Sequence, residues 1–224
     1  MARKTKEEAQ ATREGILDAA LACFHENGVA GTSLAAIGER AGYTRGAVYW
    51  HFKNKTEVLE AMINRKRIPF IKRLQRSYSP HRSTPIRDLR AAMLMSLQEL
   101  DTDPQLRDMM EIMLRNDLSA ESQAMQQLQH DSIMEEMAIF RRALERARML
   151  GQLRDGVDIN SITRTLHAGL TGVLYSAMME PDEFELQRDC RDMMDALLAH
   201  YARPGVFTAG EAPYVLPPDP EEEE

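Results

Sequence analysis

The chain has 224 residues, of which 43% are hydrophobic and 28% are charged, a composition typical of a globular protein with one large domain or two smaller ones. No apolar run approaches the roughly 18–20 residues that span a bilayer, and the start MARKTKEEAQ lacks the apolar core of a signal peptide, so we expect a cytoplasmic protein without membrane contact. The formal charge of −7 divides unevenly, with 14 Lys and Arg against 8 Asp and Glu in residues 1–76 and 14 Arg against 27 acids in the remainder. This asymmetry favours a phosphate-binding first segment joined to an acidic body, although a chance gradient would look the same.

Helical periodicity runs through almost the whole chain, and no convincing alternating strand is present. In residues 1–76 the pattern is divided by capping residues and by glycines that end helices. The expected caps are Thr5 with Glu8, Ser33, Thr44, and Asn54 with Glu57, and the expected stops are Gly28 and Gly42. These signals predict a first helix to about residue 27, two short helices after residues 33 and 44, and a fourth helix over 55–76.

The short helix expected over residues 45–51 has two different faces. At 100° per residue, the inner side carries Ala47, Val48, His51 and Phe52. Of these, Val48 and Phe52 would pack on Leu34, Ile37 and Phe24. The outer side carries Arg45, Gly46, Tyr49 and Trp50.

A folding module has little reason to expose two large aromatic side chains beside an arginine, whereas a DNA reader does. A guanidinium can bond guanine O6 and N7, aromatic edges can touch thymine methyl groups, and Gly46 lets the backbone approach the duplex. We interpret residues 32–59 as a helix-turn-helix whose second helix enters a major groove. A plain helical hairpin is the alternative.

Groups that could hold phosphates flank this helix. The Ser33 hydroxyl, Thr44, Lys53 and Lys55 are expected to fix register without reading sequence. Arg3, Lys4 and Lys6 form a basic arm for the adjacent minor groove, or else a solvated tail.

The segment SYSPHRSTP, residues 77–85, indicates a domain boundary. Beyond it, Thr84-Pro85 and Asp103-Pro104 each place proline at a first helical position. We expect helices over 85–101, 104–117, 119–150, 158–179 and 184–202. The fold class is therefore all-α, with about nine helices in a three-helix head and a six-helix body. The predicted divisions are an arm and helix-turn-helix over 1–54, a connecting helix over 55–76, a ligand-binding and dimerisation domain over 77–203, and a disordered acidic tail over 204–224.

No catalytic or metal-binding arrangement is recognisable. The six histidines are scattered, and the chain has no HExxH, no Gly-rich phosphate loop and no GxSxG elbow. We expect neither enzymatic activity nor a cofactor. Cys23 and Cys190 are expected to be reduced core thiols, with redox sensing as the alternative.

The helix-turn-helix segment and the helix before it resemble those of a known family. GTSLAAIGERAGYTRGAVYWHFKNKTEVL is similar to the DNA-binding signature of the TetR family of bacterial transcriptional repressors. MARKTKEEAQATREGILDAALACF with AGYTRGAVYWHFKNK resembles its acriflavine-resistance (AcrR-type) branch, which controls multidrug efflux. The close resemblance covers roughly residues 1–60, and Tyr43 departs from it because this branch usually has a small aliphatic residue there.

The resemblance implies a homodimer on a palindromic DNA operator. It also implies that the dimer leaves the operator when a small hydrophobic compound, cationic in some cases, binds the second domain. It carries the DNA contacts over to Ser33, Thr44, Arg45, Gly46, Tyr49, Trp50, His51 and Lys55. His51 lies on the inner face, so we expect it at the rim, bonding a phosphate.

The body is rich in methionine, with 15 in the whole chain, which favours a large plastic cavity or an ordinary core. Arg67 stands where an acid would have suited cationic effectors. The expected effector contacts are Arg67, Phe70, Met113, Asp117, Gln126, His130, Met137, Phe140, His167 and Tyr175.

Two glycines lie close together in the helix expected over 158–179. Each costs roughly 1 kcal/mol of helix stability relative to alanine, so they indicate close packing, either against a symmetry mate in a four-helix interface or within the chain. The expected dimer residues are Gly169, Gly172, Met193, Leu197 and Tyr201.

Three other functions stay open on the sequence. They are a TetR-type sensor of a metabolite or signal molecule, a non-specific architectural DNA-binding protein, and an enzyme that has kept a DNA-binding head.

Overall fold

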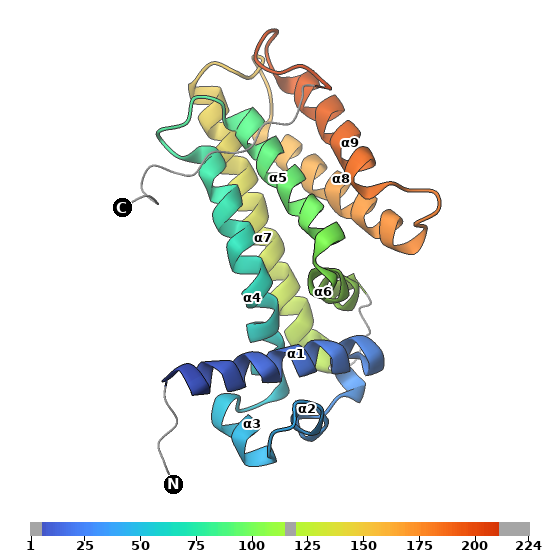
Figure 1. Cartoon of the computed structure of the whole chain (residues 1–224). Helices are drawn as coiled ribbons and strands as arrows, with labels where there is room; N and C mark the ends of the chain where they lie inside the picture. The colour runs from blue at the N-terminus through green and yellow to red at the C-terminus, as the bar shows by residue number, and fades with distance from the viewer. Residues whose placement is uncertain (1–5, 115–119, 211–224) are drawn as a thin grey trace. The chain divides into compact units, whose positions relative to one another are not determined.

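The computed structural model describes residues 6–114 and 120–210, with the side chains of 120–125 excepted (Figure 1). Over these ranges the chain forms nine α-helices and one short 3-10 helix, and a bridge between Leu153 and Ala202 is the only β-type pairing there. The all-α prediction is confirmed. The helices are α1 Lys6–Gly31, α2 Leu34–Arg40, α3 Arg45–His51, α4 Lys55–Gln75, η1 Arg76–Tyr78, α5 Pro85–Thr102, α6 Pro104–Leu114, α7 Ala120–Met149, α8 Ile159–Met179 and α9 Leu186–Tyr201.

Three of the four capping residues expected in the head begin helices, whereas Thr5 lies outside the described residues, as do Arg3 and Lys4 of the expected basic arm. The hydroxyls of Ser33 and Thr44 accept hydrogen bonds from amides in the first turns of α2 and α3, at 3.1 and 3.2 Å. The Asn54 carboxamide accepts one from the Glu57 amide at 2.9 Å. Gly28 has a φ of +72° but only kinks α1, which continues to Gly31, so the predicted stop at Gly28 became a bend.

The helices group into two compact units that are interleaved along the chain. The first unit comprises Met1–Ile68 with Asp103–Asp131, and the second comprises Pro69–Thr102 with Ser132–Glu224. The division therefore falls inside α4 and inside α7. The predicted divisions were linear, whereas α6 belongs to the first unit, because Met109 and Ile112 are buried in the same core cluster as the head residues.

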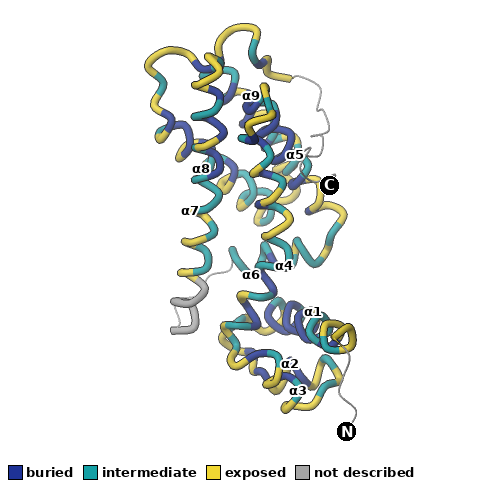
Figure 2. Tube along the Cα trace, turned by 90° about the vertical axis from the view of Figure 1, so that its left-hand side faces the viewer, coloured by how far each residue is buried: buried dark blue, intermediate teal, exposed yellow. Residues whose placement is uncertain are grey.

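The core of the first unit forms where α1 packs against the two short helices. Buried positions follow α1 (Figure 2), and Phe24, Ile37 and Val48 are all within 1% of complete burial. Gly38 lies at the closest approach of α2 and α3, since a Cβ built on it would sit 2.9 Å from Cγ2 of Val48. The two short helices are therefore held at a fixed angle by a glycine and a stiff β-branched side chain.

Polar contacts join α6 to α1 and α4 within the first unit. Nε2 of His25 lies 3.0 Å from Oε2 of Glu111, and Lys66 donates to Asp103 at the start of α6. Because these contacts frame Met109 and Ile112, α6 is docked on the head by both apolar and charged groups.

In the second unit, α9 packs beside α5 and α8 (Figure 1). A buried ion pair joins α5 to α9, with Nε of Arg90 2.5 Å from Oδ1 of Asp195. The Gly210 amide donates to the same carboxylate at 2.8 Å, and Phe207 is buried. The expectation of disorder from residue 204 is thus wrong for residues 204–210, because the Asp195 carboxylate binds Gly210 and Phe207 is buried in the core. Residues 211–224 lie outside the described part.

Asp88 in the first turns of α5 makes the stability of the second unit depend on pH. Its carboxylate is buried, Oδ1 accepts from the Thr84 hydroxyl at 3.3 Å, and Oδ2 has no hydrogen-bond partner. Burial raises the pKa of Asp88 from 3.8 to about 6, against the opposing pull of Arg82 and Thr84. The folded state therefore holds this proton more tightly than the unfolded chain does.

Because the folded pKa is raised, the stabilisation is complete below pH 3.8 and is lost as the pH rises through about 6. We expect wild type to lose about 2 kcal/mol relative to Asp88→Asn between pH 4 and pH 7. Urea unfolding of both proteins across this range measures the difference, in which the other titrating groups cancel. A difference that does not change with pH would contradict the assignment.

Candidate nucleic-acid interface

The exposed face of α3 presents an arginine and two large aromatic side chains. Tyr49 and Trp50 are 45% and 73% exposed, while Val48 and Phe52 are buried beneath them. Cζ of Arg45 lies 5.2 Å from the centre of the Tyr49 ring, which supports the guanidinium from one side. The structure thus places the predicted outer residues on one surface, with donors and aromatic edges directed away from the core.

Gly46 lies on this same surface without any crowding from the protein. The nearest atom to a Cβ built on Gly46 is the Thr44 hydroxyl oxygen, 4.0 Å away. The protein itself therefore does not require a glycine at this position. A close approach of another molecule to the backbone would require it.

Ser33, Thr44 and His51 lie around the edge of the α3 face. The oxygens of Ser33 and Thr44 accept cap hydrogen bonds, and a hydroxyl that accepts can still donate its proton to a phosphate. The His51 ring is partly buried and meets the Trp50 ring edge-on, with centroids 4.5 Å apart. His51 is therefore less buried than Val48 on the inner face of the helical wheel, and its phosphate bond stays a prediction.

Tyr43, which departs from the family pattern, packs on α1. A Cβ built on Gly15 would lie 3.3 Å from both Cε2 and the hydroxyl oxygen of Tyr43. The absence of a side chain at residue 15 therefore makes room for a large ring at residue 43, and the ring covers the core from outside.

The two lysines that the sequence treated alike differ in the structure. The Lys53 side chain is 87% exposed, with its Nζ 3.9 Å from a Glu57 oxygen. The Nζ of Lys55 instead donates to backbone carbonyls at the end of α1. A lysine side chain is long and flexible enough to extend into solvent or to fold back on the backbone. The spacing of residues in the sequence does not distinguish these two arrangements.

The residues predicted to bind an effector are divided between the two units. Phe70, Met137, Phe140, His167 and Tyr175 belong to the second unit, Arg67, Met113, Gln126 and His130 belong to the first, and Asp117 lies outside the described residues. Phe140 is completely buried and Tyr175 is half exposed. Arg67 donates to Oδ1 of Asn64 at 3.0 and 3.1 Å, which holds its guanidinium along its own helix.

Glu136 is an acidic partner of His167 that the sequence analysis missed. Its Oε1 lies 3.9 Å from Nδ1 of His167, both side chains are at most 20% exposed, and this Nδ1 makes no hydrogen bond. The pair joins α7 to α8 within the second unit. A spacing of 31 residues between helices offers no sequence signal for such a pair.

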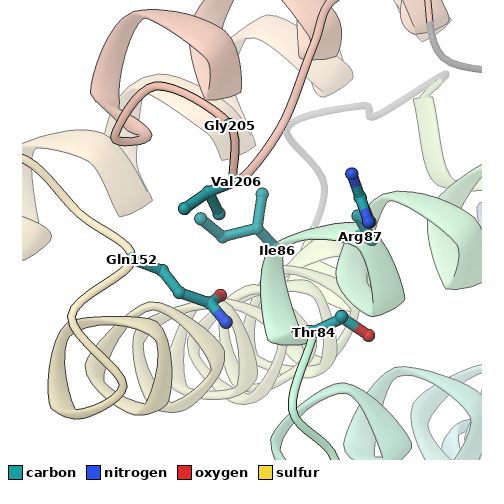
Figure 3. Close-up of a pocket in the computed structure, with 6 residues that line it drawn as sticks. All are labelled: Thr84, Ile86, Arg87, Gln152, Gly205 and Val206. Carbon is teal, nitrogen blue, oxygen red and sulfur yellow. The ribbon is translucent and has the colours of Figure 1, made fainter.

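A small cavity of about 200 Å³ opens in the second unit near the start of α5. Ile86 and Val206 lie next to each other in its wall, and the Arg87 side chain turns away from them (Figure 3). Thr84, Gln152 and Gly205 complete the lining. None of the predicted effector contacts lines it, and its volume is below the roughly 300 Å³ of typical ligand pockets.

The predicted dimer residues occupy two kinds of position on α8 and α9. A Cβ on Gly169 would lie 2.8 Å from Sδ of Met193, so this glycine makes room for a side chain of the same chain. Gly172 is exposed, and nothing lies within 4 Å of a Cβ built on it. Leu197 and Tyr201 are partly buried on the single chain.

Both cysteines are buried thiols. Burial raises the pKa of Cys23, opposed by the nearby Arg40 guanidinium, and burial raises the pKa of Cys190 to about 12. Because the thiolate is the reactive form, these surroundings favour the core-thiol interpretation over redox sensing.

The described residues contain neither a group of metal ligands nor a membrane-spanning helix. No group of three His, Cys, Asp or Glu side chains there could hold a metal ion. Within the same ranges, no helix has the length and apolar character needed to cross a membrane.

Comparison with known proteins gives two family matches and several full-length relatives. Residues 16–62 match the model of bacterial regulatory proteins of the tetR family, and residues 84–203 match the C-terminal region of MAATS-type transcriptional repressors. The chain is 30% identical to the HTH-type transcriptional regulator AcrR of Shigella flexneri, over 90% of this chain and 94% of that one. It is 32% identical to TtgR of Pseudomonas putida, over 87% and 93%.

A solved structure is also similar over nearly the full length. SmeT, the repressor of the Stenotrophomonas maltophilia multidrug efflux pump SmeDEF, is 52% identical, with a TM-score of 0.84 over 93% of this chain and 99% of that one. Its complex with triclosan gives 53% identity and a TM-score of 0.89, over 93% and 100%. The chain therefore belongs to the TetR family of bacterial transcriptional regulators.

Proposed function

We propose that this regulator is a dimeric repressor of a multidrug efflux operon. In this proposal small hydrophobic compounds, some of them cationic, release it from a palindromic operator. The observation that carries the DNA-binding part is the exposed α3 face, where Arg45, Tyr49 and Trp50 project together from a buried base. The efflux part is supported by relatives, because SmeT is described as a repressor of a multidrug efflux pump and was solved with triclosan.

In this proposal the residues around α3 divide into readers and clamps. Arg45, Tyr49 and Trp50 contact base edges, and Gly46 permits close approach of the duplex. Ser33, Thr44 and His51 bond phosphates at the rim, which fixes register.

Replacing the reading arginine should change sequence preference as well as affinity. We expect Arg45→Ala to cost about 1–3 kcal/mol of binding free energy and to relax the preference at one base pair in each half-site. Selection of bound DNA from a random pool, followed by titration of the best sequence and its single-base variants, measures both. A uniform loss across all variants would show that Arg45 contacts phosphate only.

The effector is proposed to act through helices that continue from one unit into the other. Both α4 and α7 extend across the division, so a change in the second unit that shifts either helix reaches the head. Discrimination of 1–3 kcal/mol between two states is enough for a change of about 5–150-fold in operator affinity. Glu136 beside His167 offers an acidic contact for cationic effectors.

Dimerisation is proposed to use the outer faces of α8 and α9. Gly172, Tyr175 and Met179 are exposed on α8, at spacings that share one side of the helix. With Leu197 and Tyr201 they form an apolar surface that a second copy could cover. Palindromic operators reflect such two-fold symmetry.

The testing experiment is the selection of bound DNA repeated with and without triclosan and a panel of cationic dyes. The proposal expects one palindromic sequence, bound by a dimer and released by several of these compounds. Equal affinity for random and selected DNA would favour an architectural protein. A selected operator that none of the compounds releases would favour a sensor of a metabolite or signal molecule.

A further inference from the structure

The joint between α1 and α2 is a short segment whose backbone oxygens converge on one side chain. After the kink at Gly28, the carbonyls of Val29, Ala30 and Thr32 lie 2.6, 3.3 and 3.0 Å from Nζ of Lys55. Lys55 is the first residue of α4 and lies more than twenty residues further along the chain.

This arrangement matches what an ammonium group offers. Lysine has three N–H donors and no acceptor, and three carbonyl oxygens surround it here. Three carbonyl oxygens that converge on one point make that point locally negative. A positive charge there therefore gains charge-assisted hydrogen bonds, which are stronger than those between neutral groups.

The joint is held from its other side as well. The buried Thr32 hydroxyl oxygen lies 3.0 Å from the Cys23 carbonyl and 2.8 Å from the Gly28 carbonyl. Thr32 directly precedes Ser33, the N-cap of α2. Whatever fixes Thr32 thereby fixes where α2 begins.

We propose that Lys55 is a positioning residue for DNA binding, which ties the start of α4 to the α1–α2 joint and thereby sets the placement of Ser33 and α2. The resemblance implied a direct DNA contact for Lys55, and this proposal assigns it an action through the backbone instead. Because α4 continues into the second unit, the same contact would pass a displacement of α4 directly to α2. The DNA readout below rests on the proposed function, whereas the exchange readout does not.

The first test is amide hydrogen exchange on the full-length protein without DNA. We expect amides of residues 29–37 to exchange at least tenfold faster in Lys55→Met than in wild type, with α9 amides unchanged. Lys53→Met is the matched control, since it removes the same charge from an exposed side chain, and its exchange should equal that of wild type.

The second variant, Lys55→Arg, separates positioning from phosphate binding while keeping the charge. A planar guanidinium suits phosphate at least as well as an ammonium does, but it cannot gather three donors around one point. We expect Lys55→Arg to show the raised exchange too. An arginine that restored wild-type exchange and affinity would overturn the proposal.

The third readout is the salt dependence of binding to the selected operator. Loss of one phosphate contact lowers the slope of log affinity against log salt by about 0.9. We expect Lys55→Met to bind at least tenfold more weakly at every salt concentration with an unchanged slope, and Lys53→Met to show the reduced slope.

The outcomes separate the two proposals. Unchanged exchange in both Lys55 variants, or raised exchange with wild-type operator affinity, would overturn the positioning role. A Lys55→Met variant with normal exchange and a reduced slope would identify a direct phosphate clamp. A pool that yields no preferred DNA sequence would contradict the proposed function and leave exchange to decide whether Lys55 holds the joint.

Discussion

Arg90→Ala and Asp195→Asn are each expected to lower the free energy of unfolding by about 3–5 kcal/mol. The two side chains are 4% and 5% exposed and meet through two hydrogen bonds, at 2.5 and 3.0 Å. Removing either partner leaves a buried charge without its ion-pair partner. Asp195 also accepts from the Gly210 amide, so its loss removes a hydrogen bond that holds residues 204–210 against α9.

The measurement is urea unfolding at one fixed protein concentration, because the apparent stability of the proposed dimer would depend on concentration. The double variant Arg90→Met with Asp195→Leu should recover much of the loss, since no unpaired charge remains. Arg188, which forms exposed pairs with Glu185 and Asp189, provides the control, and Arg188→Ala should have no measurable effect. Single variants that lose less than about 1 kcal/mol would contradict the importance of the buried pair.

Gly38→Ala is expected to weaken operator binding at least tenfold while changing the stability of the head only moderately. The new Cβ would lie 2.9 Å from Cγ2 of Val48 and 3.3 Å from the Tyr43 carbonyl oxygen. Overpacking of this kind costs about 1–3 kcal/mol, partly offset by the roughly 1 kcal/mol gained in helix propensity. Because Val48 belongs to α3, relief of the clash moves the reading helix.

The rescue variant is Gly38→Ala with Val48→Ala, which removes the clashing methyl groups and should restore part of the affinity. Gly46→Ala is the matched control, because a Cβ there meets nothing closer than 4.0 Å. It should leave stability unchanged or raised, and any loss of binding should persist when Val48 is shortened. If Val48→Ala rescued both glycine variants equally, the two glycines would not have the separate roles assigned to them.

Local signals in the sequence predicted the helices and the exposed face of α3 well. Hydroxyl and amide caps such as Ser33, Thr44 and Asn54 act within one turn, so their spacing alone identifies them. The outward position of Trp50 follows from the position of Val48 on the same short helix, because the two are fixed by helical geometry.

Features that depend on tertiary contacts could not be predicted in the same way. The apolar stripe of α6 shows that Met109 and Ile112 are buried but not which core they join. Lys53 and Lys55 cannot be told apart in the sequence. They differ because the path of residues 29–32 brings backbone carbonyls to Lys55 and not to Lys53. The approach of Glu136 to His167 depends on how α7 and α8 pack.

The interleaving of the two units bears on how this regulator could be recombined with others. A chimera joined between η1 and α5, at residues 79–84, would combine its own head with a foreign α6. It would replace Met109 and Ile112 under α1 together with the Glu111 and Asp103 contacts. A head transferred with residues 103–131 keeps these contacts and also Leu128 of α7, which packs against the same core. Exchangeable units in this protein are therefore discontinuous in sequence, and the useful crossover points lie inside α4, before α6 and inside α7.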